Sequence, residues 1–288
     1  MAKSYVCKIC GYVHKGDSLP EVCPVCKQPA SSFEAVKPKG FLSDKNSNAY
    51  ILTYSTVMVV VVALALAFVA LSLKDLQQAN ILNEKKQAIL VSLGAAEENY
   101  DDFVEAYAVD SKGQKVAGVD GKAVIDMLSD LTATFASGQL PVFEAKDGRV
   151  VLPVTGTGLW GPVWGYVALQ GDMSTISGIV MDHASETPGL GAEIATAKHQ
   201  DQYIGKSIFE GDKFVSITLV KGGVKAGSPS AAHEVDGITG GTKTGDGVNA
   251  MFSESLGMYV PFFNAKRAAS APAKSTECCN NVNEKSDE

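Results

Sequence analysis

The sequence predicts an α+β protein that one helix holds to a membrane, with a small metal-binding domain ahead of that helix. Three observations lead to this prediction. Residues 46–73 contain no charged side chain. Four of the six cysteines form two Cys-x-x-Cys pairs before that interval. The remainder mixes short β-branched runs (RVVLPVTG, WGYVALQ, STISGIVM and FVSITLV) with helical stretches such as GKAVIDMLSDLTATF. It lacks the regular strand–helix alternation of a parallel α/β fold.

Composition sets limits on the class of protein. The 288 residues are 45% hydrophobic, which is enough for one sizeable core and suggests about two domains. Residues 1–45 hold seven Lys and Arg against four Asp and Glu, whereas residues 74–288 hold 18 against 28. Nucleic acids need a basic surface for their phosphates. The acidic portion therefore argues against a nucleic-acid partner.

Residues 50–73 form the predicted transmembrane helix. At about 1.5 Å per residue, some 20 residues cross the ~30 Å hydrocarbon core of a bilayer. Tyr50 and Tyr54 lie near one end, where aromatic side chains favour the membrane interface. A buried core helix rarely stays apolar on all faces for this length, and a signal peptide would not lie fifty residues into the chain. A single span makes no channel by itself.

The orientation of this span follows from the cysteines rather than from the nearby lysines. Three lysines precede the span closely and three follow it closely, so the positive-inside rule gives no direction. Thiolates that await a metal are best kept in a reducing compartment. We therefore expect residues 1–49 to be cytoplasmic, with no cleavable signal ahead of them, and residues 74–288 to be extracytoplasmic.

The four paired cysteines predict a tetrahedral metal site. The pairs are separated by 12 residues, and each short loop can turn two sulfurs toward one ion. Spacing alone favours a small zinc ribbon over an iron site. His14 is expected at the surface, because four sulfurs already complete the tetrahedron. The predicted ligands are Cys7, Cys10, Cys23 and Cys26.

The rest of the chain divides by composition. Residues 37–49 are polar with Pro, Gly and Ser and predict a linker. Residues 74–93 have apolar side chains at helical spacing and should continue the span as a stalk helix. Residues 266–288 are low in apolar content and predict a disordered tail, in which the adjacent Cys278 and Cys279 are expected to be solvated.

Three glycine-rich segments stand out, at 156–166, 186–194 and 236–248. None matches a phosphate-binding P-loop or a dinucleotide-binding fingerprint. Glycine loops near hydroxyls and lysines can cradle an anion with backbone amides, but tight turns would explain them equally well. The other histidines, His183, His199 and His233, have no ligand spacing and are expected to be structural or solvated.

The N-terminal segment that contains both cysteine pairs resembles the short rubredoxin module of rubrerythrins. The sequence CGYVH begins at Cys10, PEVCPVCKQP surrounds the second pair, and Phe33 follows shortly after. This resemblance covers about residues 4–36. It implies a rubredoxin-like domain over residues 1–36 with one iron held by four thiolates, which transfers one electron at a time.

The larger portion resembles the C subunit of the Na+-translocating NADH:quinone reductase, with the related G subunit of the Rnf complex second. The order GLW, ETPGLG, VKGG and D-x-x-[ST]-G-x-T carries the resemblance, from about Leu52 to Phe262. It implies an FMN-binding domain over residues 74–265, on the outer face of the bacterial inner membrane. The segments GLW and ETPGLGAE resemble the quinone reductase subunit more than the Rnf subunit.

In that family the threonine that ends Ser-Gly-Ala-Thr carries FMN through a phosphoester bond, which a flavin transferase installs. The matching residues here are Thr239, Gly240, Gly241 and Thr242, so two positions differ but remain small. The resemblance implies that FMN is attached to Thr242, and we expect the loop of this threonine to be exposed so that the transferase can reach its hydroxyl. It also implies that five residues line the flavin or its phosphate: Trp160, Glu186, Thr187, Leu190 and Lys221.

The expected function is an electron-transfer subunit of this sodium-pumping reductase, which passes single electrons toward quinone between other membrane subunits. Two alternatives remain at this point. One is a subunit of an Rnf complex, which is a ferredoxin:NAD reductase. The other is a membrane-tethered assembly module that holds zinc and no flavin.

Overall fold

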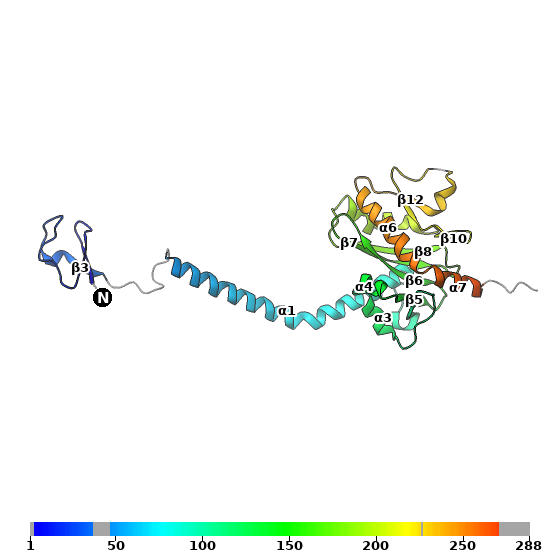
Figure 1. Ribbon diagram of the computed structural model, residues 1–288, viewed down its shortest axis with the longest axis horizontal. Coiled ribbons are helices and arrows are strands. Elements are labelled where there is room, and N and C mark those ends of the chain that lie inside the picture. The colour runs from blue at the N-terminus through cyan, green and yellow to red at the C-terminus, as the bar shows by residue number, and fades with distance from the viewer. Residues whose placement is uncertain (1–2, 37–46, 226, 271–288) are drawn as a thin grey trace, which may run out of the picture. The chain divides into compact units, whose positions relative to one another are not determined.

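A computed structural model describes residues 3–36, 47–225 and 227–270 of the chain. The chain divides into two compact units, Met1–Leu76 and Gln77–Glu288. One helix, α1, runs through the boundary between them (Figure 1). Most of the expected linker, residues 37–46, lies outside the described residues, as do residues 271–288 with Cys278 and Cys279.

The N-terminal unit begins with a three-stranded antiparallel sheet in the order β2-β1-β3. Its elements are β1 (Lys3–Cys7), β2 (Val13–Gly16), the 3-10 helix η1 (Ala30–Ser32) and β3 (Phe33–Val36). Gly11, at φ +73°, allows the chain to turn between β1 and β2. Cys7, Cys23 and Phe33 are buried together in a small core. A core this small depends on further cross-linking for stability, as a metal can provide.

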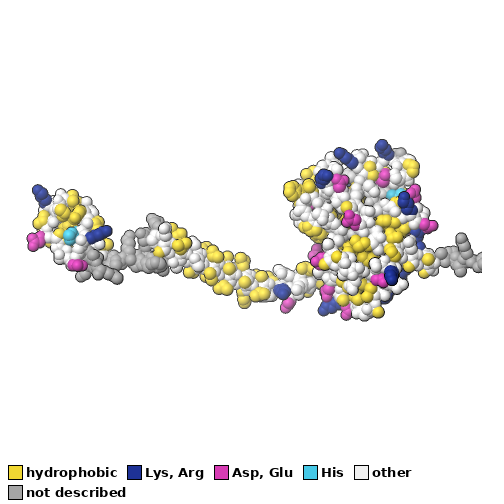
Figure 2. Space-filling model, viewed as in Figure 1, with side chains coloured by type: hydrophobic (Ala, Val, Ile, Leu, Met, Phe, Trp, Pro, Cys, Tyr) yellow, Lys and Arg dark blue, Asp and Glu magenta, His cyan; other side chains and the backbone are white. Residues whose placement is uncertain are grey.

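Helix α1 spans Asn48–Ser92 and contains the predicted transmembrane segment. Among the described residues it is the one helix long and apolar enough to cross a membrane, with a mean hydropathy of 2.8 over its most apolar window. None of that window is buried in the protein, which excludes a core helix. Hydrophobic side chains cover its surface (Figure 2). The predicted stalk is confirmed, because the same helix continues until Ile89 and Leu90 enter the core of the C-terminal unit.

A five-stranded antiparallel sheet forms the centre of the C-terminal unit and confirms the α+β class. The strands follow the chain in spatial order, so that each pairs with its sequence neighbours. They are β4 (Val104–Val109), β5 (Leu140–Ala145), β6 (Val150–Thr157), β7 (Pro162–Leu169) and β8 (Ile176–His183). β6 and β7 pair over their whole length, from Val150 opposite Leu169 to Thr157 opposite Pro162. Three predicted β-branched runs correspond to β6, β7 and β8.

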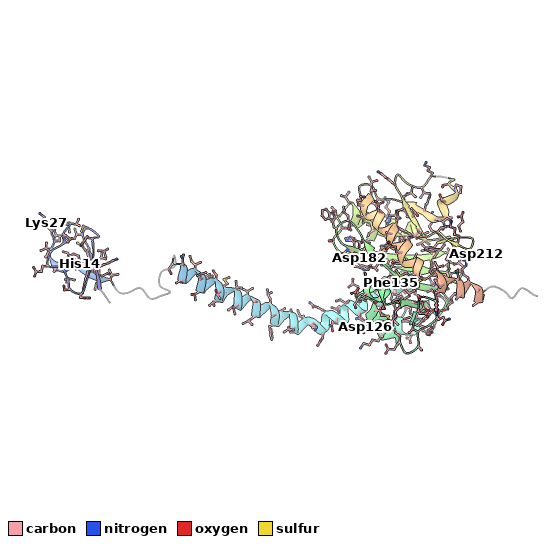
Figure 3. The ribbon with its side chains drawn as sticks, in the orientation of Figure 1. His14, Lys27, Asp126, Phe135, Asp182 and Asp212 are labelled. Atoms are coloured by element: carbon pink, nitrogen blue, oxygen red, sulfur yellow. The ribbon has the colours of Figure 1, made fainter. Side chains whose placement is uncertain are left out.

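Helices of the C-terminal unit are α2 (Tyr100–Phe103), α3 (Gly121–Met127), α4 (Leu131–Ala136), α5 (Ala197–Gln200), α6 (Thr242–Met258) and α7 (Val260–Ser270). The sequence predicted one helix where α3 and α4 lie. Asp130 separates them, because its carboxylate accepts a hydrogen bond from Ala133 N and caps a new helix. The buried ring of Phe135 on α4 meets Tyr259 edge-on, with centroids 6.2 Å apart (Figure 3).

Helix α6 packs on strand β6 through glycines. A Cβ on Gly156 would lie 2.7 Å from Met251 Cβ, so only glycine lets the helix come this close. Ser255 Oγ also accepts a hydrogen bond from Thr155 N at 3.2 Å. These contacts set the position of the C-terminal half of α6 relative to the sheet.

Four short strands and three 3-10 helices complete the part of the C-terminal unit that the structure describes. The expected strand FVSITLV is interrupted at the buried Ser216, whose φ of +64° breaks the extended chain. β11 and β12 pair in parallel. β11 is followed by Gly222 and Gly223, and β12 leads into the third glycine-rich segment. The elements are η2 (Gly191–Ala195), η3 (Asp201–Tyr203), β9 (Phe209–Glu210), β10 (Lys213–Phe214), β11 (Thr218–Val220), η4 (Pro229–His233) and β12 (Glu234–Asp236).

The C-terminal boundary of the folded unit lies further along the chain than predicted. Helix α7 continues to Ser270, so residues 266–270 are helical rather than part of a disordered tail. Lys266 Nζ donates to Glu144 Oε1 at 2.7 Å, which ties the end of α7 to β5. Composition missed this contact because it joins residues 122 positions apart.

Candidate metal and cofactor sites

The four predicted cysteines meet at one point in the N-terminal unit. Their Sγ atoms all lie within 4.8 Å of one another. Cys7 Sγ is 3.5 Å from Cys26 Sγ, and Cys10 Sγ is 3.5 Å from Cys23 Sγ. A tetrahedral ion with metal–sulfur bonds of about 2.3 Å needs sulfurs about 3.8 Å apart. The thiol groups therefore fit a single four-coordinate metal ion.

The two cysteine loops repeat the same local design. Hydrogen bonds from the backbone amides of Cys10 and Ile9 lower the pKa of Cys7 to about 7. For Cys23, burial by itself raises the pKa, but the amides of Cys26 and Val25 outweigh it and leave the pKa lowered. Backbone amides that stabilise the thiolate form of a cysteine favour metal binding, because the thiolate is the form that binds a metal. His14 lies on β2 and is not part of the cluster (Figure 3).

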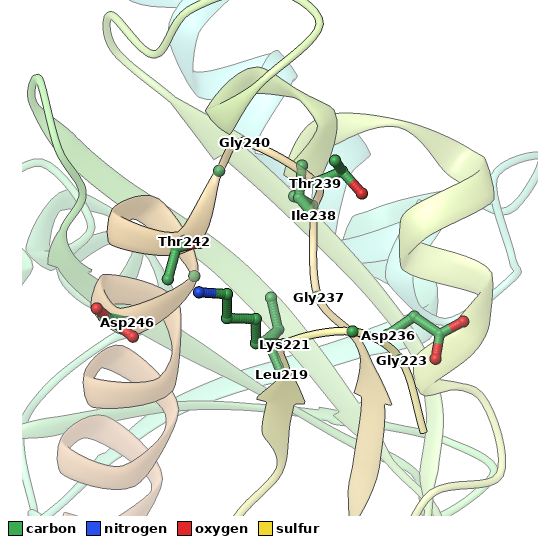
Figure 4. Close-up of a pocket in the computed structure, with 13 residues that line it drawn as sticks. Leu219, Lys221, Gly223, Asp236, Gly237, Ile238, Thr239, Gly240, Thr242 and Asp246 are labelled. Atoms are coloured by element: carbon green, nitrogen blue, oxygen red, sulfur yellow. The ribbon is translucent and has the colours of Figure 1, made fainter. Parts of the chain in front are cut away.

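Thr242 is the first residue of α6 and lies at a cavity of about 490 Å³ (Figure 4). The sequence predicted an exposed loop here. The side chain is exposed, but its backbone is already helical. The cavity is lined by Leu219, Lys221, Gly222, Gly223, Asp236, Gly237, Ile238, Thr239, Gly240, Gly241, Thr242, Gly245 and Asp246.

Two glycines shape the chain before Thr242. Gly240 has a φ of +78°, and a Cβ there would lie 2.5 Å from Leu190 Cδ2. Gly241 precedes the helix, and a Cβ there would lie 2.9 Å from Ile238 Cγ2. A larger residue in place of Gly240 would push the second glycine-rich segment, which contains Leu190, away from the third. The two segments are therefore in direct contact beside Thr242.

The first turn of α6 and Lys221 supply positive charge near Thr242, in a cavity whose lining also includes Asp236 and Asp246. The N–H groups of the first turn of a helix have no intrahelical acceptor and carry partial positive charge. Figure 4 shows the Lys221 side chain extending toward this turn, whereas the Thr239 hydroxyl points away from Thr242. A phosphate attached to Thr242 would meet both the helix terminus and Lys221. These residues fit the phosphate of FMN.

Four of the predicted contacts are not part of the cavity lining: Trp160, Glu186, Thr187 and Leu190. Trp160 is 67% exposed and Leu190 is 41% exposed. Thr187 is exposed, and its carbonyl accepts bonds from the Leu190 and Ala192 amides. Glu186 is buried, with 4% exposure, and its carboxylate contacts protein groups. The structure thus brings the three glycine-rich segments together. Of these predicted residues, Glu186 is buried and the others are exposed.

Sequence reasoning missed two residues near Thr242. Asp246 lines the cavity one turn further along α6, and its Oδ2 lies 3.6 Å from Lys243 Nζ. Thr244 is buried and bonds to Glu186. Thr244 is two residues and Asp246 four residues after Thr242. This spacing indicates a shared helical turn only once a helix is known to begin at Thr242.

The three remaining histidines contribute to structure, as predicted. His199 is buried and its Nε2 lies 3.2 Å from the Tyr203 hydroxyl. His183 Nδ1 accepts a bond from Glu186 N, and His233 Nδ1 lies 2.6 Å from Ser207 O. Within the described ranges, the cysteine cluster is the one group found with ligand atoms placed to share a metal.

Two family models match the chain. The FMN-binding domain matches residues 158–257, which include Thr242, most of the first glycine-rich segment and all of the second and third. The rubrerythrin rubredoxin-like domain matches residues 5–34, which include all four cysteines. The fold and the two sites therefore define a flavin-binding-domain protein that carries a rubredoxin-like domain.

Relatives identify a narrower family. The C subunit of the Na(+)-translocating NADH-quinone reductase from Vibrio parahaemolyticus is 32% identical over 75% of this chain and 91% of its own length. The Haemophilus ducreyi C subunit is 31% identical over 78% and 98%. The crystal structure of the Parabacteroides distasonis C subunit matches with a TM-score of 0.58 and 39% identity, covering 66% of this chain and 96% of that one. This chain belongs to the family of these C subunits.

Proposed function

We propose that this chain is an electron-transfer subunit of a Na+-translocating NADH:quinone reductase, with FMN joined by a phosphoester to Thr242. The observation that carries the proposal is the position of Thr242, an exposed hydroxyl at the first turn of α6 and at the edge of a cavity. Family membership supports the oxidoreductase complex. FMN, when bound, supplies electron transfer one electron at a time, here toward quinone.

The residues around Thr242 have separate roles in this proposal. Lys221 and the amides of the first turn of α6 offset the phosphate charge. Gly240 and Gly241 leave room for the phosphoester. Thr239 contributes to the cavity wall, and Trp160, Thr187 and Leu190 are exposed beside the cavity, where a flavin ring could contact them. An exposed acceptor also suits modification by a flavin transferase, which must reach the Thr242 hydroxyl.

The rubredoxin-like unit is proposed to hold iron rather than zinc. The match to the rubrerythrin rubredoxin-like domain and the four converging sulfurs support a mononuclear site. One iron with four thiolates transfers a single electron, whereas zinc has no redox chemistry. The match of the C-terminal unit to an FMN-binding domain speaks against an assembly module without flavin.

The proposed location is the bacterial inner membrane, with residues 50–73 of α1 in the lipid bilayer. Residues 1–36 form the cytoplasmic iron domain, residues 37–49 the linker, and residues 74–270 the extracytoplasmic unit, with α7 included. The unburied apolar surface of α1 supports the span. Other membrane subunits of the complex would supply and receive electrons.

The proposal is tested by Thr242→Val, which is nearly isosteric but has no hydroxyl. We expect complete loss of covalent flavin, measured as ultraviolet fluorescence of the band in a denaturing gel, with the chain still folded in the membrane. Thr239→Val is the matched control, and it should keep the fluorescent band. Fluorescence that persists in Thr242→Val would contradict the assignment.

A further inference from the structure

Glu186 joins two segments that are far apart in the sequence. Its Oε1 accepts a hydrogen bond from Trp160 N at 2.8 Å, and its Oε2 accepts one from Thr244 Oγ1 at 2.6 Å. Trp160 lies between β6 and β7, and Thr244 is two residues beyond Thr242 in α6. The carboxylate therefore bridges the first glycine-rich segment and the helical turn that begins at Thr242.

The bridge is a buried charge. Burial by itself raises the pKa of Glu186, but the bond from Thr244 and the backbone amides of residues 159–161 outweigh it, and the pKa is lowered. None of the ion pairs found in residues 3–36, 47–225 and 227–270 includes Glu186. Its negative charge is thus satisfied by hydrogen bonds and is not cancelled by a cation.

Glycines make room for this carboxylate on two sides. A Cβ on Gly158 would lie 2.5 Å from Glu186 Oε1. A Cβ on Gly191 would collide with Glu186 Oε2 and with Thr244 Oγ1. Gly158 belongs to the first glycine-rich segment and Gly191 to the second, so Glu186 lies where these segments meet α6. A side chain so enclosed restricts the movement of each segment relative to the others.

We infer that Glu186 is a positioning residue of the cofactor site. It holds the loop of Leu159 and Trp160 and the first turn of α6 in one arrangement, so that the exposed indole of Trp160 keeps a constant position relative to Thr242. The resemblance implied that Glu186 touches the flavin. Its two carboxylate oxygens are instead engaged with Trp160 N and Thr244 Oγ1.

The inference has a second consequence, which rests on the proposed attachment of FMN to Thr242. A constant negative charge opposes the addition of an electron nearby, and it does so more strongly where water is excluded. Glu186 should therefore keep the flavin harder to reduce than a neutral residue would. Neutralising it should move the flavin midpoint potential to a more positive value.

Three variants separate geometry from charge. Glu186→Gln removes the charge, while its amide can still accept from Trp160 N and donate to Thr244 Oγ1. Glu186→Ala removes both the charge and the bridge. Glu254→Gln is the matched control, because it removes one acidic charge from an exposed position on α6, the helix that begins at Thr242. All three are made in the full chain with Trp164→Phe, which leaves Trp160 as the single tryptophan, since the chain has two.

Three readouts are measured: the motion of Trp160, which needs no flavin, the flavin midpoint potential and the amount of covalent flavin. Time-resolved anisotropy of Trp160 should show slow motion in the parent and in Glu186→Gln, and an added fast component in Glu186→Ala. The flavin midpoint potential should shift positive in Glu186→Gln and stay unchanged in Glu254→Gln. Covalent flavin should fall severalfold only in Glu186→Ala. Circular dichroism checks that each variant is folded.

The inference is overturned if Trp160 is equally immobile in Glu186→Ala and in the parent. It is also overturned if Glu186→Gln and Glu254→Gln have the same midpoint potential. A parent chain without covalent flavin would instead contradict the proposed attachment to Thr242, and the anisotropy would still decide the role of Glu186.

Discussion

At the scale of single residues, a flavin attachment at Thr242 depends on neighbours with little or no side chain. Gly240 and Gly241 bring the chain past Leu190 and Ile238 and into the first turn of α6. Lys221 is the basic side chain of the cavity lining and extends toward that turn. The residues therefore offer space, a hydroxyl and positive charge in one place, which is what a phosphoester requires.

Lys221→Met should slow the attachment of flavin to Thr242 by about tenfold. The reason is the loss of a charge-assisted contact to phosphate worth about 1–2 kcal/mol, and 1.4 kcal/mol corresponds to about tenfold in rate. The measurement is the time course of in-gel fluorescence with purified flavin transferase. Lys221→Arg should retain most of the rate. Lys225→Met, which removes a lysine outside the cavity lining, should match the unmodified sequence, and an equal loss there would point to a general charge effect.

At the scale of elements, close contacts between helices and the sheet determine where the site lies. α6 approaches β6 through Gly156, and α7 is tied to β5 through Glu144. Glu144 accepts bonds from Lys266 Nζ and from the Tyr107 hydroxyl, the latter at 2.6 Å. Burial by itself raises the pKa of Glu144, but these bonds outweigh it and the pKa is lowered.

This shift predicts how stability depends on pH. A carboxyl with a lower pKa in the folded state stabilises the fold above its ordinary value of 4.5, and the contribution is lost as pH falls through the folded pKa. Glu144→Gln should lower the free energy of unfolding by roughly 1–2 kcal/mol at pH 7. Its urea midpoint should also vary less than that of the parent between pH 3 and 5.

Glu105→Gln is the control for this prediction. Glu105 lies opposite Glu144 in the pairing of β4 with β5, but its side chain is 69% exposed. An exposed ion pair contributes about 0.5 kcal/mol or less. Urea titrations at several pH values measure both variants in detergent. Equal losses in the two would show that burial of Glu144 has no special effect.

At the scale of the whole molecule, the four-cysteine site and the proposed flavin site belong to separate units. The cysteine site belongs to Met1–Leu76 and the Thr242 site to Gln77–Glu288. α1 has 45 residues, and its last turn, with Ile89 and Leu90, belongs to the core of the second unit. If residues 50–73 cross the bilayer, the two sites face opposite compartments, and other subunits must carry electrons across about 30 Å of hydrocarbon.

The N-terminal unit should contain one iron per chain. The full chain with Thr242→Val is used, so that flavin absorbance does not obscure the thiolate-to-ferric band in the visible spectrum. Adding Cys10→Ser, which replaces an exposed ligand, should abolish that band and lower the iron content severalfold. Adding Cys278→Ser instead should change neither. Stoichiometric zinc in protein purified from its own host would contradict the assignment.

The orientation is tested with a membrane-impermeant thiol reagent on intact cells. The parent carries Cys278→Ser and Cys279→Ser, because these native cysteines follow α7 and are themselves expected outside. Ser253→Cys, at an exposed position of α6, should then react, and Ser43→Cys should react only after the cells are opened. Reaction at Ser43 with protection at Ser253 would invert the proposed topology.

The sequence by itself determined the features that depend on local chemistry. Four cysteines in two short loops predict a metal site, an uncharged run as long as a bilayer is thick predicts a transmembrane helix, and short β-branched runs predict strands. None of these predictions needs knowledge of the fold. The glycine-rich segments and Thr242 could be singled out through their resemblance to a family. The cysteine cluster, the long apolar helix and three of the five strands of the central sheet, β6, β7 and β8, lie where the sequence predicted.

Tertiary structure decided what depends on contacts between distant residues. Glu186 meets Thr244, 58 residues away, and Lys266 meets Glu144 across 122 residues. The first contact makes Glu186 a buried bridge rather than a surface acid, and the second extends the folded unit into residues expected to be disordered. Composition and periodicity report only neighbours along the chain. The surroundings of a charged side chain are determined by the segments that fold against it, and these are known only once the sheet and its helices have packed.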